Sequence, residues 1–379
     1  MNMGAGAYEG AGAYDGNAYD GNAYDGNPLA GRDLLRLLDL SPAEFALVLD
    51  TAADQKAAWA AGERDEPYAG KSVAIILEKP SLRTRSSFEI GARRLGCHPL
   101  VMSDDHSAFS RGETVHDTVL VLERFVDAIV LRTFGQEKVA EVAKWAGVPV
   151  VNALTDSFHP CQGLADALTI REHKGGLAGL VLAYVGDGNN MAHTYAELGA
   201  LAGMHVRIAT PDGYGPDEQI VAECREVAGG ASGAGGPGVA AGGSGAAGGS
   251  SGAGGPGAAG GPGAAGGPGA VGTGADIELV SDPREAVSGA DVVITDTWTS
   301  MGDEAEHDER LRAFEGFQVN DSLMGLAAGD AIFLHCLPAH RGEEVTDGVM
   351  DGPQSVIFDE AENRLHAQKA LLALVMARP

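Results

Sequence analysis

Short apolar runs alternate with helical patterns along most of this chain, and this alternation constrains the fold more than any other feature. The apolar runs are rich in Val and Ile, lack polar alternation, and span 73–77, 128–131, 148–152, 180–185, 205–210, 277–280, 292–296 and 332–336. Such runs are typical of parallel strands covered on both faces. Helical patterns lie between them, for example at 32–61, 86–95, 114–124, 163–173 and 192–202. We therefore predict an α/β fold in which parallel sheets are flanked by helices.

Length and charge limit the classes of partner. The chain has 379 residues, which is enough for two hydrophobic cores and hence two domains. Its net charge of -27 argues against binding to nucleic acid or to an anionic membrane, because both need a positive protein face. No apolar run reaches the length of a membrane span, and the four cysteines have neither secreted-scaffold nor CxxC spacing. We expect a cytoplasmic protein without disulfides.

Two low-complexity segments interrupt the α/β pattern. Residues 13–27 are three copies of Ala-Tyr-Asp-Gly-Asn, a composition that favours turns and buries little. We expect residues 1–27 to be a disordered tail, with ordered structure starting near Pro28. Residues 229–274 are almost entirely Gly, Ala, Pro and Ser. Because the α/β pattern resumes after them, we interpret them as a flexible insertion within a domain.

A candidate phosphate site follows the first apolar run. Residues 81–85 read Ser-Leu-Arg-Thr-Arg at a predicted helix start, where unpaired backbone N–H groups favour anions. Ser81 and Thr84 add hydroxyl donors, and Arg83 and Arg85 add permanent charge. Taken alone, the motif equally fits a serine N-cap followed by arginines on a solvated helix face.

Further polar residues follow the next two runs. Arg132 comes after 128–131, and His159-Pro160-Cys161-Gln162 follows 148–152 at another predicted helix start. His159 can donate to a carbonyl oxygen and Gln162 can bind an amide group. A structural histidine and a proline in the first helical turn are the alternative interpretation. Ligands of such folds collect at the carboxyl ends of the strands, where all these residues are predicted to lie.

The segment Gly186-Asp187-Gly188-Asn189-Asn190 opens a predicted helix after the run 180–185. It has two glycines of the dinucleotide-binding fingerprint, but Met191 occupies the place of the third, which disfavours a nicotinamide-dependent dehydrogenase. Side-chain amides at this position suit an amino acid whose carboxylate faces the helix N-terminus.

Two motifs follow the last two runs. Asp296 begins a stretch that continues through Ser300-Met301-Gly302; its carboxylate could hold an ammonium group, and the loop could close as a lid. An Asp cap and a turn are the simpler interpretation. His335-Cys336-Leu337-Pro338 ends the final run. Adjacent strand residues point to opposite faces, so we do not expect His335 and Cys336 to share a metal. Cys336 is also compatible with simple burial, and Pro338 with a cis peptide bond.

Together, and in this order, these motifs resemble the ornithine carbamoyltransferases. Ala361-Glu362-Asn363-Arg364 adds to the resemblance, which covers Pro28 to Ala377 apart from the glycine-rich block. It implies that carbamoyl phosphate is bound by Ser81, Leu82, Arg83, Thr84, Arg132, His159, Pro160, Cys161, Gln162, Cys336, Leu337 and Arg364. It implies that L-ornithine is bound by Asn190, Asp296, Ser300 and Met301, and that Cys336, Arg83, His159 and Asp296 are catalytic, without metal or cofactor.

The resemblance also implies an organisation. Residues 28–162 with 355–379 would form a carbamoyl phosphate-binding domain, and 163–354 an ornithine-binding domain that carries the insertion. The assembly would be a homotrimer, or several trimers, with shared active sites. One departure is Ala108, where many members carry a glutamine that acts in a neighbouring subunit; Ser107 or Ser110 could substitute for it.

Three other functions remain open at this point. Within the transferases, aspartate or putrescine could replace ornithine, although Ser300-Met301-Gly302 and the motif at 335–338 favour ornithine. From a different class, the chain could be a dehydrogenase, which Met191 disfavours. It could also be a non-catalytic scaffold, as the repeats and Ala108 suggest, but a scaffold would not need the remaining motifs.

Overall fold

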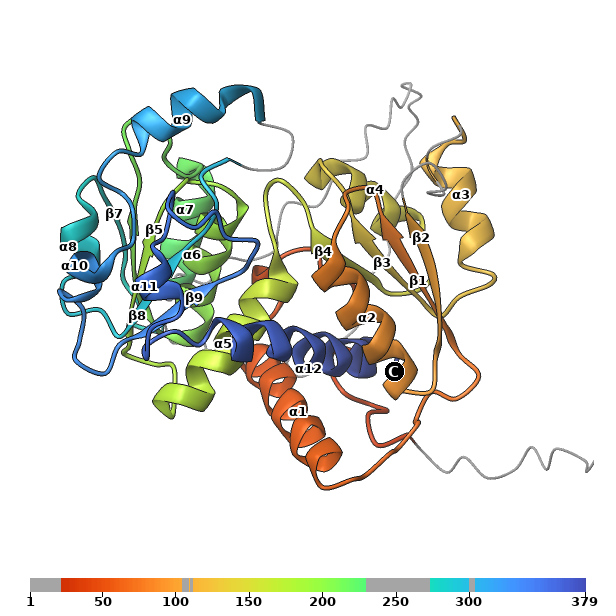
Figure 1. The fold of residues 1–379 in the computed structure, drawn as a ribbon. Coiled ribbons are helices and arrows are strands. Elements are labelled where there is room, and N and C mark those ends of the chain that lie inside the picture. Colours follow the sequence, from red (N-terminus) through yellow and green to blue (C-terminus); the bar gives the residue numbers. More distant parts are fainter. Residues whose placement is uncertain (1–21, 104–108, 110–111, 230–272, 300–303) are drawn as a thin grey trace, which may run out of the picture.

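The computed structural model describes residues 22–103, 109, 112–229, 273–299 and 304–379. Its strands form two parallel sheets (Figure 1). The first has the order β2-β1-β3-β4 and consists of β1 (Ser72–Leu77), β2 (His98–Ser103), β3 (Ala128–Arg132) and β4 (Val150–Leu154). The second has the order β7-β6-β5-β8-β9 and consists of β5 (Val181–Val185), β6 (His205–Ala209), β7 (Ile277–Val280), β8 (Val292–Thr295) and β9 (Ile332–His335). The predicted fold class is confirmed.

Helices cover both sheets. Those of the first half are α1 (Pro42–Ala60), α2 (Leu82–Arg94), α3 (Val115–Leu122) and α4 (Gln136–Trp145). Those of the second half are α6 (Asn190–Ala202), α7 (Glu218–Ala228), α8 (Pro283–Val287), α9 (His307–Ala313), α10 (Asp321–Met324) and α11 (Asp347–Met350). Two more, α5 (Pro160–Lys174) and α12 (Ile357–Val375), connect the halves, and short 3-10 helices span Leu37–Asp39 and Glu304–Glu306. None of the described helices is both long and apolar enough to cross a membrane.

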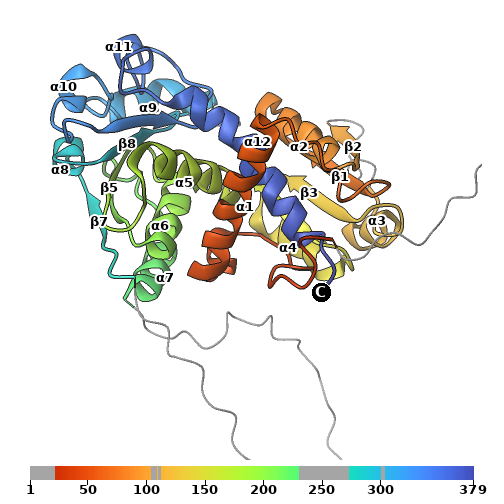
Figure 2. The same cartoon turned by 90° about the horizontal axis from the view of Figure 1, so that it is seen from below.

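The connection between the halves is a packed core. Helix α12 contacts β9 in the second half and α1 and α2 in the first, and it lies against α5 along much of its length (Figures 1 and 2). Its apolar side chains from Ala367 to Met376 are buried together with those of α5 and with the inner faces of both sheets. One continuous cluster of buried side chains therefore holds the two halves in register.

Two expectations about the elements need correction. Strand β2 was not predicted because it pairs only with β1 at the sheet edge, contains Pro99 and is incompletely buried, so it lacks a continuous apolar signal. The predicted helix 32–61 is two elements. Ser41 caps α1 by accepting from the backbone N–H of Glu44, and Pro42 sets the first helical position.

The N-terminal repeats end in ordered turns. We expected ordered structure to start near Pro28, but it starts earlier. The ring of Tyr24 stacks on that of Tyr68, and its hydroxyl accepts a hydrogen bond from Gln55. Asn27 donates to the carbonyl of Leu374 at 3.0 Å. The third repeat unit is thus held by the C-terminal helix, an environment that its own composition does not reveal.

The ends of the glycine-rich insertion lie side by side. The backbone N–H of Gly274 donates to the carbonyl of Ala228, the last residue of α7, at 3.3 Å. The backbone then continues into β7, which pairs with β6. Residues 230–272 lie outside the described residues. The two points at which they join the domain are held next to each other by this hydrogen bond.

Candidate active site

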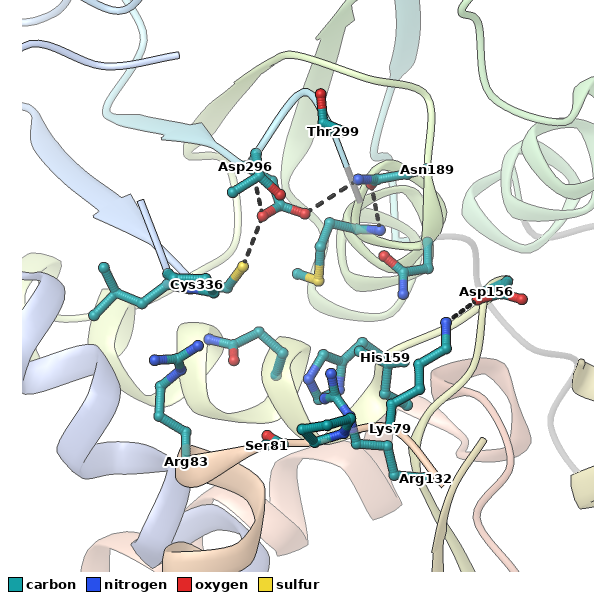
Figure 3. Close-up of a pocket in the computed structure, with 18 of the residues that line it drawn as sticks. Lys79, Ser81, Arg83, Arg132, Asp156, His159, Asn189, Asp296, Thr299 and Cys336 are labelled. Carbon is teal, nitrogen blue, oxygen red and sulfur yellow. Dashed lines mark hydrogen bonds and ion pairs between the residues drawn. The ribbon is translucent and has the colours of Figure 1, made fainter. Parts of the chain in front are cut away.

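A cavity of about 1090 Å³ lies between the two sheets, at the carboxyl ends of their central strands. One wall, the cationic wall, comes from the first half and from α5 and α12: Lys79, Ser81, Arg83, Arg132, His159, Gln162 and Arg364. The facing wall, the acidic wall, comes from the second half: Asp187, Asn189, Asn190, Asp296, Thr297, Thr299 and Cys336 (Figure 3). This is the strand-end position predicted from the motifs.

Helix α2 contributes Ser81 and Arg83 to the cationic wall because its first turn faces the cavity. Ser81 is the N-cap and accepts from the backbone N–H of Thr84 at 3.2 Å. Arg83 lines the cavity, whereas Arg85 pairs with Glu89 on the exposed side of the helix. Leu82 also lines the cavity and is 78% exposed. The helix start therefore combines free N–H groups, a dipole and one arginine at the same point.

Thr84 lies behind this wall and holds two arginines. Its hydroxyl oxygen accepts from Arg364 at 3.1 Å and from Arg132 at 3.4 Å. Thr84 is fully buried, and both guanidinium groups are largely buried. Burial, followed by the positive charges of Arg364 and Arg83, lowers the pKa of Arg132 to about 10. Three like charges held this closely in a largely buried wall make a strong site for an anion.

His159 is a neutral hydrogen-bonding group in this wall. It precedes α5, its backbone N–H donates to Thr194, and it is buried. Burial, followed by the charges of Arg364, Arg132 and Arg83, holds the pKa of its imidazole well below the usual value. Its Nδ1 makes no hydrogen bond to any described residue. A neutral imidazole can donate to a ligand oxygen without adding a fourth charge.

The two neighbours of His159 lie elsewhere. Pro160 forms the first position of α5, and Cys161 is fully buried with its thiol donating to the carbonyl of Asn152 at 3.3 Å. Neither side chain lines the cavity. Of the predicted segment 159–162, His159 and Gln162 thus line the cavity, whereas Pro160 starts the helix and Cys161 anchors it.

Asp296 organises the acidic wall. It follows β8, accepts from Asn189 at 3.1 Å and is contacted by the Cys336 thiol at 3.1 Å (Figure 3). Burial, followed by the charges of Asp296 and Glu360, raises the pKa of Cys336 well above its usual value. The thiol is therefore protonated at neutral pH and is a poor nucleophile. Asn190 also lines the cavity, and its amide donates to Thr155 at 2.6 Å.

The motif after β9 turns sharply. The Leu337-Pro338 peptide bond is cis, as the sequence suggested, and Leu337 has a left-handed backbone with φ 57°. Leu337 lines the cavity with its neighbours Cys336 and Pro338. A non-glycine residue with this backbone conformation is uncommon and is found preferentially at functional sites.

The prediction that His335 and Cys336 point apart was wrong, because the chain leaves the strand geometry at this point. Ligand atoms of Asp296, His335 and Cys336 lie within 4.8 Å of one another. However, both imidazole nitrogens of His335 are engaged: Nδ1 accepts from the backbone N–H of Leu337 at 2.9 Å, and Nε2 contacts Glu344 at 3.1 Å. The ring in this arrangement has no lone pair left for a metal.

Several lining residues were not predicted. Lys79 is buried, contacts Asp156 at 2.5 Å and lies over the ring of Phe134. Lys79 comes two positions after the first apolar run, 73–77. This place at a predicted strand end could have identified it as a site residue. His307 and His340 also line the cavity, but they come from α9 and from the loop after β9, where no pattern marks them. The predicted Ser300 and Met301, and Ala108, lie outside the described residues.

Comparison with known proteins identifies the family. Residues 32–172 match the family described as aspartate/ornithine carbamoyltransferase, carbamoyl-P binding domain, and residues 178–234 and 269–375 match its Asp/Orn binding domain. This chain belongs to the aspartate/ornithine carbamoyltransferase family. The carbamoyltransferase match is interrupted between residues 234 and 269, inside the glycine-rich insertion.

Individual carbamoyltransferases agree with this assignment. The chain is 47% identical to ornithine carbamoyltransferase of Symbiobacterium thermophilum over 349 residues, which cover 92% of this chain and 99% of that protein. It is 49% identical to the enzyme of the same name from Acidothermus cellulolyticus, covering 89% and 94%. The solved ornithine carbamoyltransferase from Pyrococcus furiosus aligns with a TM-score of 0.79 and 44% identity, covering 92% of this chain and 98% of that one.

Proposed function

We propose that this chain transfers the carbamoyl group of carbamoyl phosphate to the δ-amine of L-ornithine, which yields L-citrulline and phosphate in arginine metabolism. The observation that carries the proposal is one cavity whose opposite walls carry opposite charge. The cationic wall suits the phosphate of the first substrate, and the acidic wall suits the amines of the second.

In this proposal, carbamoyl phosphate lies along the cationic wall. Its phosphate takes the N–H groups at the start of α2 with Ser81, Leu82, Arg83 and Arg132. Thr84 supports the site from behind through the two guanidinium groups that it binds. Charge on the departing phosphate is then stabilised by groups that need no rearrangement during the reaction.

The carbamoyl group lies deeper in the cavity. The neutral imidazole of His159 donates to the carbamoyl oxygen, and Arg83 adds positive charge as that oxygen becomes anionic in the tetrahedral intermediate. Gln162, Arg364 and the backbone around Cys336 and Leu337 surround the carbamoyl amide. Pro160 and Cys161 start and anchor α5, and their side chains do not contact the substrate.

Ornithine occupies the acidic wall, held by Asn190 and Asp296 together with Ser300 and Met301. Its neutral δ-amine attacks the carbamoyl carbon, the bond between that carbon and the phosphate oxygen breaks, and the proton lost by the amine passes to the departing phosphate. Asp296 and the thiol of Cys336 orient the amine, and Asp296 balances its developing positive charge. Because the Cys336 thiol is protonated, no covalent cysteine intermediate forms.

We further infer the assembly and the domain division. The carbamoyl phosphate domain is 28–162 with 355–379, and the ornithine domain is 163–354 with its insertion; the protein works in the cytoplasm as a homotrimer or as several trimers with shared sites. Helix α12 supports this division, since it returns from β9 in the second half to α1 and α2 in the first (Figure 2).

The test is product formation with a panel of amines. Purified protein is mixed with carbamoyl phosphate and ornithine, putrescine or aspartate, and carbamoylated product and phosphate are both quantified. We expect citrulline and an equal amount of phosphate with ornithine, and no product above the uncatalysed rate with the other two amines. Product with putrescine or aspartate, or no product with any amine from a folded protein, would refute the proposal.

A further inference from the structure

A buried pair of carboxyl groups lies directly behind the cationic wall. Asp166 is on α5 and Glu360 is on α12, and their side chains are 0% and 1% exposed. Both carboxyl groups lie within hydrogen-bonding distance of one amide nitrogen, that of Gln162. Neither residue lines the cavity, and the reaction outlined above uses neither.

Both members of the pair bind the same end of Gln162. The amide Nε2 of Gln162 donates to Asp166 at 2.7 Å and to Glu360 at 2.9 Å, which uses both of its N–H groups. Its Oε1 accepts from Arg364 at 2.6 Å. The reverse orientation of this amide would place its oxygen against two carboxyl groups and its N–H groups against a guanidinium. The pair therefore leaves Gln162 only one orientation.

The remaining contacts of the pair complete the arrangement. Asp166 accepts from the hydroxyl of Tyr195 on α6 at 3.0 Å, and Glu360 accepts from the backbone N–H of His335 in β9 at 2.8 Å. Burial raises the pKa of Asp166 to about 6, and burial together with the neighbouring Asp166 charge raises that of Glu360 well above its usual value. The other charged or titratable groups that face the pair are Arg364 and Cys336.

We propose that Asp166 and Glu360 are positioning residues that present the carbonyl oxygen of Gln162, and not its N–H groups, to the substrate. The inference rests on the proposed function and specifies its recognition step. An oxygen at this place accepts from the amide group of carbamoyl phosphate. The same site would then disfavour acetyl phosphate, a close analogue that has a methyl group in place of that amide, because the acceptor would be left without a donor.

The test is a double-mutant cycle on the KM for carbamoyl phosphate. Glu360→Gln keeps the size of the side chain and an acceptor for the backbone N–H of His335, but it places an N–H group where Gln162 needs an acceptor. We expect the KM for carbamoyl phosphate to rise about tenfold or more in this variant, while the KM for ornithine changes less than about twofold. In the Gln162→Ala background, where no amide has to be oriented, the same change should alter the KM by less than about twofold.

The matched control is Glu362→Gln, two residues along α12, where the side chain is exposed and outside the cavity. It should leave both KM values unchanged. If Glu360→Gln does not fold, Asp166→Asn runs the same cycle with the same expectation. Equal effects of the change in the presence and absence of Gln162, no effect in either, or unfolding of both variants would overturn the positioning role. An inactive wild type would instead refute the proposed function, so the two failures are distinguishable.

Discussion

The two walls of the cavity differ in how their polar groups are held. On the cationic wall, Arg132 and Arg364 are buried and share the hydroxyl of Thr84, which comes from a helix packed on a sheet core. On the acidic wall, Asp296 is held by Asn189 and by the Cys336 thiol, groups that lie in loops at strand ends and at a helix start. Regular elements thus build one wall, and connections between elements build much of the other.

This difference indicates how a strongly acidic protein can hold an anion. The chain carries a net charge of -27, so its overall field repels carbamoyl phosphate. Arg83, Arg132, Arg364 and Lys79 converge on one wall, where burial reduces screening by salt and water. The acidic wall needs no such cluster of charged side chains, because the negative net charge of the protein already attracts a positively charged amine.

Removal of Arg83 should have the largest effect. In Arg83→Ala the phosphate loses a charge at the helix start, and we expect kcat/KM for carbamoyl phosphate to fall by about a thousandfold. The matched control is Arg85→Ala, two positions along the same helix, where the arginine pairs with Glu89 away from the cavity. Steady-state citrulline assays should show less than about threefold loss in the control. Similar losses in both variants would mean that general charge, and not the cationic wall, attracts the substrate.

The contact between the halves should titrate. Glu197 on α6 is fully buried, accepts from Arg36 and from the backbone N–H of Leu37, and burial raises its pKa to about 7. Because the pKa of Glu197 is higher in the folded than in the unfolded protein, its protonated form stabilises the fold. This contribution is complete below about pH 4.5 and is lost as the pH rises through about 7. Between pH 4.5 and 8, the free energy of unfolding should fall by up to about 3 kcal/mol more in wild type than in Glu197→Gln.

Urea unfolding at several pH values measures this difference. Glu223→Gln changes the other carboxylate partner of Arg36, whose side chain is 41% exposed, and serves as the control. It should keep the wild-type pH dependence to within about 1 kcal/mol. If the free energy of unfolding depends on pH in the same way in wild type and in Glu197→Gln, then Glu197 stays ionised in the folded protein. Its contact with Arg36 is in that case an ordinary ion pair.

Asp296 tests the acidic wall in the same way. Asp296→Asn keeps the size of the side chain and can still contact Asn189, but it removes the charge opposite the amine. We expect the KM for ornithine to rise about fiftyfold, while the KM for carbamoyl phosphate stays within about threefold of wild type. Initial rates with each substrate varied in turn give both values. A larger effect on carbamoyl phosphate than on ornithine would show that the walls do not divide the substrates as proposed.

The smallest effect is expected from the glycine-rich insertion. Its attachment points are already hydrogen-bonded, so residues 230–272 can be replaced by a link of two or three residues. We expect kcat/KM for both substrates to change less than about twofold, since closing a shorter loop costs little. The same assays on the shortened protein check this. A large loss with one substrate only would assign the insertion to that wall.

The sequence predicted every described strand except β2, including the edge strands β4, β7 and β9. Strands such as β3 and β8 contain continuous apolar runs, and the polar residues Arg132, which ends β3, and Asp296, which follows β8, were correctly expected at the sheet end. Strand β2 was missed because its edge position allows Pro99 and partial exposure. The third N-terminal repeat was expected to be disordered because its contacts to α12 come from residues more than 300 positions away.

The site could be predicted where a motif concentrates its residues in one helix start, as in Ser81 to Thr84. It could not be predicted where unrelated segments converge. His307 and His340 reach the cavity from the second half, and only the folded arrangement brings them there. The carboxyl pair of Asp166 and Glu360 was not predicted for the same reason. Its members lie on two helices that are distant in the chain, and no local sequence pattern links them.

Calorimetric titration with a compound that spans the cavity tests whether one cavity holds both substrates on walls of opposite charge. A phosphonoacetyl group joined to the δ-nitrogen of ornithine presents the phosphonate to one wall and the amino acid to the other. We expect it to bind wild type at least about a hundredfold more tightly than carbamoyl phosphate or ornithine alone, and to be weakened by both Arg83→Ala and Asp296→Asn. Binding no tighter than that of the separate substrates, or weakening by only one of the two variants, would contradict the account.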